Sequence, residues 1–185
     1  MNDFFIALGA NLPSSQGAPD ETLRAALQDL SASDVVVEAT SHFYRTPCFP
    51  AGAGPDYVNA AAHVRSSLSP RDFLDHLHAI EAKFGRERIE RWGMRSLDLD
   101  VLACGQRVEP DLTTFETWRT LSPEQQRKAA PDALILPHPR LQDRAFVLVP
   151  LRDIAPNWTH PVLNLTVTQM CDALPPDALA EISVL

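Results

Sequence analysis

The chain of 185 residues has only three cysteines, Cys48, Cys104 and Cys171. They are widely spaced and odd in number, so they match neither a zinc-binding pattern nor a complete disulfide set. We expect reduced thiols, buried as small apolar side chains, in a cytoplasmic protein. The sequence also lacks the run of about 20 apolar residues that a membrane-spanning helix needs. Its first residues, MNDFFIALGANL, carry an early acid and a short apolar run, unlike a secretory signal peptide.

Positive charge is in short supply. Sixteen Lys and Arg face 24 Asp and Glu, which gives a net charge of −8. A nucleic-acid-binding protein usually has a basic face overall, so we expect no nucleic-acid partner. The length and the ordinary hydrophobic fraction of 45% fit one soluble domain spanning residues 1–185. We also expect a monomer without a membrane partner.

The familiar phosphate-binding and nucleophile motifs are missing. The sequence contains no G-x-x-x-x-G-K-[ST], no G-x-G-x-x-G and no G-x-S-x-G. A bound nucleotide must therefore be held by metal ligands, arginines and aromatic side chains rather than by a glycine-rich loop. Such a set favours direct transfer between bound substrates over a covalent enzyme intermediate.

The order of apolar patterns predicts an α+β fold. Apolar or β-branched runs predict strands, and apolar residues at helical spacing after capping residues predict helices. The expected strands are 4–8 (ending at Gly9), 35–44, 57–64 and 98–103, and the expected helices are 19–30 and 70–84. This β-α-β-β-α-β order resembles a ferredoxin-like plait. We expect an insertion near 107–133 with a short helix after Ser122, a buried strand or extended segment at 147–149, and a C-terminal extension with one or two short helices.

The stretch from Arg86 to Leu102 carries the strongest chemical signal. Leu97, Leu99 and Val101 alternate with Asp98 and Asp100, so both carboxylates project from one face of a strand, roughly 6.6 Å apart. Such a pair suits Mg²⁺, which proteins hold through a few carboxylates together with substrate phosphates. Alternatively, a D-x-D pair is simply the solvent face of a half-exposed strand. Asp is disfavoured in strands, and we expect this one to be central in its sheet, where a metal compensates the two charges.

Four arginines precede the aspartates, namely Arg86, Arg88, Arg91 and Arg95. With two glutamates among them, the local charge is 4 − 2 = +2, against the acidic background of the chain. Guanidinium groups beside a carboxylate pair are typical of a polyphosphate site. Surface pairing is the alternative, but exposed ion pairs contribute only about 0–1 kcal/mol each.

Other side chains suit a flat second ligand. Phe49 and Trp92 lie among Pro, Gly and Arg, where a ring can stack on them, and the amide of Asn59 both donates and accepts, as a heterocycle edge requires. His138, held between two prolines near Arg140 and Arg144, suits a phosphate donor; a merely structural histidine is the alternative.

The chain resembles the 6-hydroxymethyl-7,8-dihydropterin pyrophosphokinases. The resemblance is carried by FFIALGANL, YRTP, DYVNAA, RWGMRSLDLDVL, PHPRLQDRAFVLVPL and IAPNW, in that order. It covers most of residues 3–106 and 134–158. It implies transfer of the β,γ-pyrophosphoryl group of ATP, as co-substrate, to the pterin hydroxymethyl group in folate biosynthesis, with release of AMP.

The resemblance also implies residue roles. Asp98 and Asp100 would hold two Mg²⁺ ions, and Arg86 and Arg95 would neutralise charge in the transition state, with Arg88 as an alternative to Arg86. The ATP site would include Glu81, Arg88, Arg91, His138 and Arg144. The pterin would lie between Phe49 and Phe146, with Tyr57 and Trp92 nearby, while Asn59, Thr46 and Pro47 read its edge.

Three questions stay open at this point. We expect the insertion at 107–133 to pack beside the ATP-side loops, and a lid is the sharper alternative. A regulatory module that binds a nucleotide without catalysis would use the same arginines and aromatics but gives the paired carboxylates no task. A metal-dependent phosphohydrolase would release phosphate without a pterin acceptor.

Overall fold

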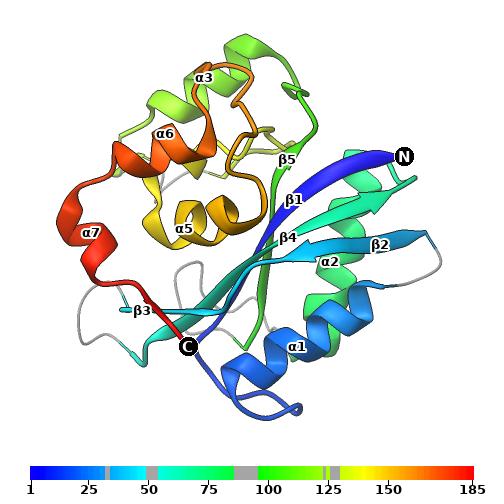
Figure 1. Cartoon of the computed structure of the whole chain (residues 1–185). Helices are drawn as coiled ribbons and strands as arrows, with labels where there is room; N and C mark the ends of the chain where they lie inside the picture. Colours follow the sequence, from blue (N-terminus) through cyan, green and yellow to red (C-terminus); the bar gives the residue numbers. More distant parts are fainter. Residues whose placement is uncertain (32–33, 49–53, 86–95, 123, 126–129) are drawn as a thin grey trace.

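The computed structural model describes residues 1–31, 34–48, 54–85, 96–122, 124–125 and 130–185 (Figure 1). The elements in chain order are β1 (Asn2–Ala10), α1 (Pro19–Leu30), β2 (Val35–Thr40), β3 (Tyr44–Thr46), β4 (Tyr57–Ser66), α2 (Pro70–Lys83), β5 (Asp98–Cys104), α3 (Leu112–Thr120), the 3₁₀ turn η1 (Leu141–Asp143), α5 (Ala145–Ile154), α6 (Val167–Asp172), α7 (Pro176–Ala180) and β6 (Ser183–Val184).

One antiparallel sheet organises the molecule. Its order is β5-β1-β4-β3-β6, and β2 pairs with the other half of β4. The predicted α+β class is confirmed, and the strand predicted at 35–44 is divided into β2 and β3. The expectation that the aspartates lie on a central strand is wrong, because β5 is an edge strand with β1 as its neighbour. The compensation that a central position requires is therefore smaller.

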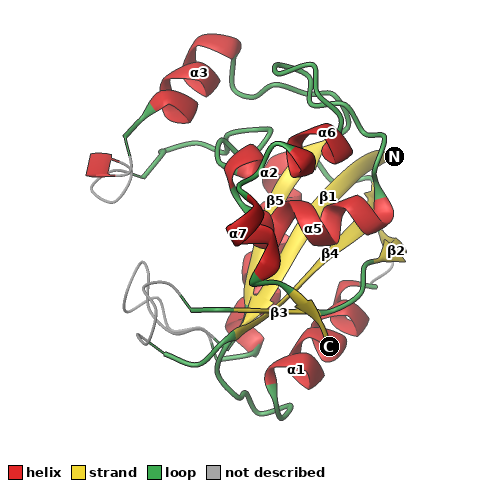
Figure 2. Cartoon of the chain, turned by 60° about the vertical axis from the view of Figure 1, so that its left-hand side comes forward, coloured by secondary structure: helices red, strands yellow, loops and turns green. Residues whose placement is uncertain are grey.

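Two apolar layers cover the two faces of the sheet. Ile6, Leu8 and Leu99 belong to a core cluster under α1 and α2, whereas Ala61 and Leu102 belong to a second cluster under α5 and α6. Figures 1 and 2 show α1 and α2 on one side of the sheet and α5 to α7 on the other. Among the described residues, no helix has the length and apolar character needed to cross a membrane.

Helix α2 begins and ends where the capping residues predict. The Ser69 side chain accepts a hydrogen bond from the Asp72 amide, and Pro70 occupies the first turn. Gly85 follows with φ +78°, a left-handed conformation that glycine adopts without strain. The helix therefore stops just before the arginine segment.

Residues 147–149 are helical, so the expectation of a strand there is wrong. They belong to α5, where Val147, Leu148 and Val149 are all buried between the sheet and α6. A short helix covered on both sides needs apolar residues all round, and such a run has the same composition as a buried strand. Pro150 lies inside this helix instead of ending it.

The insertion leaves the sheet after β5 and returns beside its own starting point. Glu109 and Leu136 exchange two backbone hydrogen bonds of 2.9 and 3.0 Å, which close the insertion at its base. Helix α3, which the sequence pattern did not indicate, buries Phe115 against His160 of the C-terminal extension at 5.7 Å between ring centroids. This contact lies near Gly105, just after β5, where the Gly105 carbonyl accepts the Trp158 indole N–H at 3.0 Å and Trp158 packs against His160. The loop at 86–95 lies outside the described residues, so packing of the insertion beside the ATP-side loops stays a prediction. Most of the helix expected after Ser122 falls on residues 123 and 126–129, which lie outside the described part.

His160 should make the docking of the insertion sensitive to acid. The ring is fully buried, and its Nδ1 accepts the amides of Val162 and Leu163 at 3.2 Å. Burial, together with the charge of Arg119, lowers the pKa of His160 to about 4 from its ordinary value of 6.5. In the unfolded chain, His160 therefore binds a proton below about pH 6.5, whereas in the folded chain it binds one only below about pH 4. Stability is full above this window and falls as the pH drops through it, by up to about 3 kcal/mol.

The measurement is the free energy of unfolding in urea between pH 7.5 and pH 4, for the wild type and for His160→Gln. We expect the wild type to lose more stability over this range than the variant loses. Equal losses would contradict the assignment of the effect to His160.

Candidate functional site

The two aspartates lie at the start of β5, on the face opposite to the apolar cluster under α2. Leu97, Leu99 and Val101 are at most 3% exposed on the α2 side, while Asp98 and Asp100 are half-buried on the other. The Oδ1 atom of Asp98 is buried. The alternation predicted from the sequence is therefore present, and both carboxylates share one face of a rigid strand.

Strand β1 connects the carboxylate pair to the residue expected to recognise a heterocycle. Gly9 is paired with Asp98 of β5 on one side and with Asn59 of β4 on the other. Directly paired residues project to the same face, so Asn59 and Asp98 lie in one row across the sheet, about two strand spacings or 9.6 Å apart. Ala7 connects Asp100 and Ala61 in the same way.

The Asn59 amide is fixed by a neighbour from another strand. Its Nδ2 donates to Thr46 Oγ1 at 2.7 Å, and both side chains are buried, at 7% and 4% exposure. This bond orients the amide, whose carbonyl oxygen Oδ1 lies on the Gly9 side. Tyr57, two residues before Asn59 and paired with Thr46, lies on the same face and is half-buried, whereas Pro47 is exposed.

Gly9 makes room for Asn59, a role that the sequence pattern did not reveal. The strand expected to stop at Gly9 continues to Ala10, and a Cβ at Gly9 would lie 2.8 Å from Asn59 Oδ1, closer than such atoms normally approach. Glycine inside a strand often marks a close approach, and this is the signal that could have identified the position. Asn11, also missed, is 2% exposed and donates to the Pro55 carbonyl at 3.2 Å, so it fixes the start of β4.

We expect Gly9→Ala to weaken binding of the heterocyclic ligand about tenfold or more, because the new methyl group must displace the Asn59 amide from Thr46. Binding of the nucleotide should change little. The measurement is the dissociation constant of each ligand by calorimetry. If Gly9 acts through Asn59, the two changes will not be additive in a Gly9→Ala, Asn59→Ala double mutant; full additivity would argue against this role.

His138 lies against the outer edge of β5 and is poised as a neutral donor. Its amide donates to the Leu102 carbonyl at 2.7 Å, and its Nδ1 accepts the Arg140 amide at 3.0 Å. Burial and the charges of Arg144 and Arg140 lower the pKa of His138 to about 3, with Asp98 acting in the opposite direction. The ring is therefore neutral, and because Nδ1 is an acceptor, the proton is on Nε2, available to a phosphate oxygen.

Helix α5 presents Arg144 and Phe146 at its N-terminal end. The Arg144 guanidinium carbon lies 5.7 Å from the centre of the Phe146 ring, which is 40% exposed. An aromatic ring this exposed can cover a flat ligand. These two residues thus combine a cation and an apolar surface at one position.

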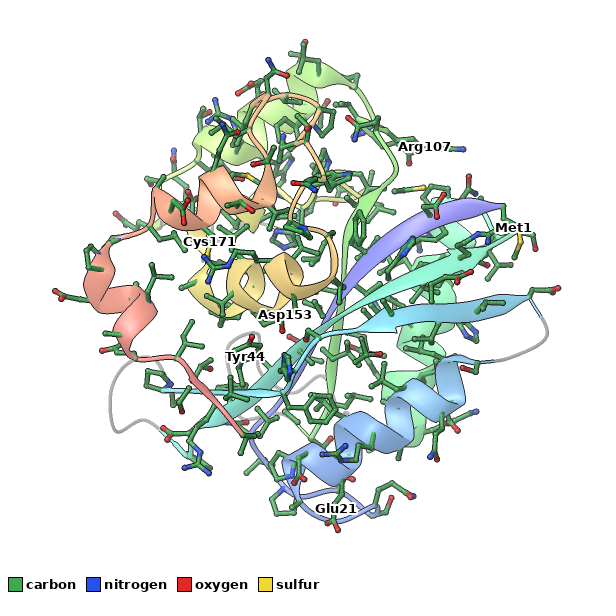
Figure 3. All side chains as sticks on the ribbon, in the orientation of Figure 1. Met1, Glu21, Tyr44, Arg107, Asp153 and Cys171 are labelled. Atoms are coloured by element: carbon green, nitrogen blue, oxygen red, sulfur yellow. The ribbon has the colours of Figure 1, made fainter. Side chains whose placement is uncertain are left out.

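The other end of α5 is tied to the β2–β3 connection. Figure 3 shows Tyr44 and Asp153 side by side; the Tyr44 hydroxyl donates to Asp153 Oδ2 at 2.8 Å, and the His42 amide donates to the same oxygen at 3.1 Å. Burial, together with this hydrogen bond, raises the pKa of Tyr44 to about 12. The tie fixes α5 relative to the strand that carries Thr46.

Glu81 lies on the other side of the sheet from these groups. It is 1% exposed on α2, and its Oε1 accepts the Leu99 amide at 2.7 Å. The carboxylate thus reaches β5 from the α2 side, and it binds the amide of the residue that lies between the two aspartates in sequence. Phe49, Trp92 and the four arginines Arg86, Arg88, Arg91 and Arg95 lie outside the described residues.

The donor set fits magnesium bound together with a substrate. Among the described residues, no cluster of three or more His, Cys, Asp or Glu forms a metal cage by itself. Asp98 and Asp100 supply two carboxylates on one face, and Mg²⁺ is usually bound by one or two carboxylates with water and substrate phosphates completing its shell. The residues present therefore suit a hard cation that arrives with a polyphosphate.

Comparisons with known proteins agree on one family. A model of the family "7,8-dihydro-6-hydroxymethylpterin-pyrophosphokinase" matches residues 5–156. A 2-amino-4-hydroxy-6-hydroxymethyldihydropteridine pyrophosphokinase of Synechocystis is 38% identical over 168 residues, covering 90% of this chain and 73% of that protein. The protein of the same name from Haemophilus influenzae is 36% identical over 172 residues, covering 91% and 92%.

Solved structures support the fold. The crystal structure of Plasmodium falciparum HPPK-DHPS with SDX-DHP is similar with a TM-score of 0.63 and 14% sequence identity. The similarity covers 93% of this chain and 43% of that one, so the chain described here spans less than half of that protein. At this identity the likeness concerns the fold alone.

Proposed function

Since the chain belongs to the 7,8-dihydro-6-hydroxymethylpterin-pyrophosphokinase family, we propose that it transfers the pyrophosphoryl group of ATP to the hydroxymethyl group of 6-hydroxymethyl-7,8-dihydropterin in folate biosynthesis. The pterin hydroxyl oxygen attacks the β-phosphorus, the bond to the α-phosphate oxygen breaks, and AMP leaves. The observation that supports this proposal within the structure is the row Asn59–Gly9–Asp98, in which the residue proposed to recognise the heterocycle and a carboxylate proposed for the metal share one face of the sheet.

Asp98 and Asp100 are proposed to hold two Mg²⁺ ions. Bound there, the ions would neutralise phosphate charge and orient the polyphosphate for in-line attack. The half-buried position of both carboxylates supports this role, because partial removal from water strengthens their attraction for a cation. His138 is proposed to donate from Nε2 to a phosphate oxygen, and Arg144 to add a positive charge nearby.

The pterin is proposed to bind at the β3–β4 side of the row. The Asn59 amide, fixed by Thr46, offers a carbonyl oxygen to the heterocycle edge, while Tyr57 and Phe146 offer ring surfaces. Pro47, Phe49 and Trp92 remain proposed members of this site. Arg86 and Arg95 remain the proposed charge-neutralising arginines, with Arg88 as the alternative to Arg86, and Arg91 remains proposed for ATP.

The proposal also covers the domain organisation, the cellular location and the oligomeric state of the protein. Strand β6 pairs with β3, so the C-terminal extension completes the sheet, which supports one domain over 1–185. Cys104 and Cys171 are free and buried, whereas Cys48 is free but only half-buried, so burial of all three cysteines is not confirmed. Free thiols are usual in the reducing cytoplasm, where we propose that the protein is located. We propose that the protein acts there as a monomer.

The test is product analysis with Mg·ATP and 6-hydroxymethyl-7,8-dihydropterin. We expect AMP and the pterin diphosphate in equal amounts, and no AMP when either magnesium or the pterin is left out. Phosphate release without the pterin would instead identify a phosphohydrolase. Binding of ATP with no turnover would identify a regulatory module.

A further inference from the structure

Glu81 is an acidic side chain in an apolar setting. It lies in the last turns of α2 at 1% exposure, next to Ile80, and Leu99 of the strand that it faces belongs to the core cluster under α2. Burial of a carboxylate is costly unless hydrogen bonds stabilise the charge. A glutamate at this position therefore depends on the hydrogen bonds that its carboxylate accepts.

The structure gives Glu81 a backbone partner on β5. Its Oε1 accepts the Leu99 amide at 2.7 Å, the length of a strong bond to a charged acceptor. β5 is an edge strand, and alternate residues of an antiparallel edge strand turn their amides away from the neighbouring strand. Glu81 binds one of these outward amides, that of Leu99. Asp98 and Asp100 are the residues directly before and after Leu99.

A second hydrogen bond joins the chain segments that flank the end of α2 and the start of β5. Ser96 Oγ donates to the Phe84 carbonyl at 2.9 Å, so the chain just after α2 and the chain just before β5 lie side by side. The two bonds, at Ser96 and Leu99, bracket Asp98. The end of α2 thus fixes the start of β5 on both sides of the first aspartate.

We propose that Glu81 is a positioning residue, which holds the Leu99 amide and thereby sets the positions of Asp98 and Asp100, rather than a residue that contacts ATP. This inference rests on the proposed magnesium role of the two aspartates. The 1% exposure of Glu81 and its bond to a β5 amide support action through the backbone.

Three substitutions separate the hydrogen bond from the charge. Glu81→Gln keeps an oxygen acceptor at the same reach but removes the charge. Glu81→Met keeps the volume but removes the acceptor, and Glu81→Asp keeps the charge but withdraws it from Leu99 by one methylene. The matched control is Glu21→Met, which removes a carboxylate that accepts the Ala18 amide at 2.8 Å at the start of α1.

The first measurement is hydrogen exchange of the Leu99 amide by NMR in the protein without ligands. We expect protection in the wild type and in Glu81→Gln, and exchange at least tenfold faster in Glu81→Met and Glu81→Asp. The second is the Mg²⁺ concentration for half-maximal AMP formation, which should rise at least fivefold in the Met and Asp variants. It should stay within about twofold in the Gln variant and in the Glu21→Met control.

The outcomes decide the role. A Gln variant as impaired as the Met variant, or an Asp variant equal to the wild type, would show that charge and not the bond matters, and would overturn the proposal. Normal Leu99 protection in Glu81→Met would do the same. If Glu81→Met does not fold, the Gln and Asp pair still separates bond from charge. Absence of AMP formation in the wild type would count against the proposed function, while the Leu99 exchange would still be measured.

Discussion

Replacement of Asp98 or Asp100 by alanine is expected to reduce AMP formation by about 10³-fold or more, since each change removes one of the two carboxylates proposed for the metal. The fold should persist, because both side chains are only half-buried and the residues that β5 contributes to the core under α2, Leu99 and Val101, are unchanged. Initial rates at saturating Mg·ATP and pterin, with the thermal unfolding midpoint measured on the same samples, provide the check.

A matched control is Asp75→Ala, which removes an exposed carboxylate paired with Arg71 on α2. It should leave the rate within about twofold of the wild type, since an exposed ion pair contributes only about 0–1 kcal/mol. An Asp98→Ala enzyme that kept a tenth or more of the wild-type rate would remove the basis for the metal assignment.

The second large effect is expected at Asn59. In Asn59→Leu, the side chain keeps its approximate volume but cannot hydrogen-bond the pterin, whose polar edge is then buried without partners. We expect kcat/KM for the pterin to fall about 10²- to 10³-fold, in line with the cost of leaving polar groups unpaired in a site built to bind them. The dissociation constant of Mg·ATP should stay within about threefold of the wild-type value.

Thr46→Val is the graded comparison. It removes the oxygen that accepts from Asn59 Nδ2, so the amide remains but loses its fixed orientation. We expect an intermediate loss of about tenfold for the pterin, at the scale of one hydrogen bond. An unchanged pterin KM in Asn59→Leu would exclude the residue from pterin recognition.

Local patterns in the sequence predicted most of the elements that carry the site. The capping of α2 by Ser69 and Pro70, and the alternation through Asp98 and Asp100, depend only on near neighbours in the chain, and both are found in the structure. The segment 147–149 was predicted wrongly because its environment, between the sheet and α6, is a tertiary property. An apolar run of that length does not distinguish a strand from a helix covered on both sides.

Relations between distant residues account for the rest. The sequence indicates Asn59 and Asp98 separately, and Gly9 only as the end of a strand, but the register of three strands is what puts them in one row. Likewise, Glu81 and Leu99 are 18 positions apart, and no periodicity within either element indicates that one accepts the amide of the other. Register and helix docking follow from the packing of the whole core, which single-segment patterns do not contain.

Strand β1 has a consequence for how this protein can vary. It is hydrogen-bonded along both edges, to β4 and to β5, so a one-residue shift would reverse the facing of its side chains against both neighbours at once. The register of β1 therefore aligns Asp98 on β5, proposed for the metal, with Asn59 on β4, proposed for the pterin. Substitutions on β4 or on β5 change the side chains of one strand at a time. An insertion or deletion within β1 would change the register against both strands. We expect natural insertions to accumulate after Cys104, as at 107–133, and not between Asn2 and Ala10.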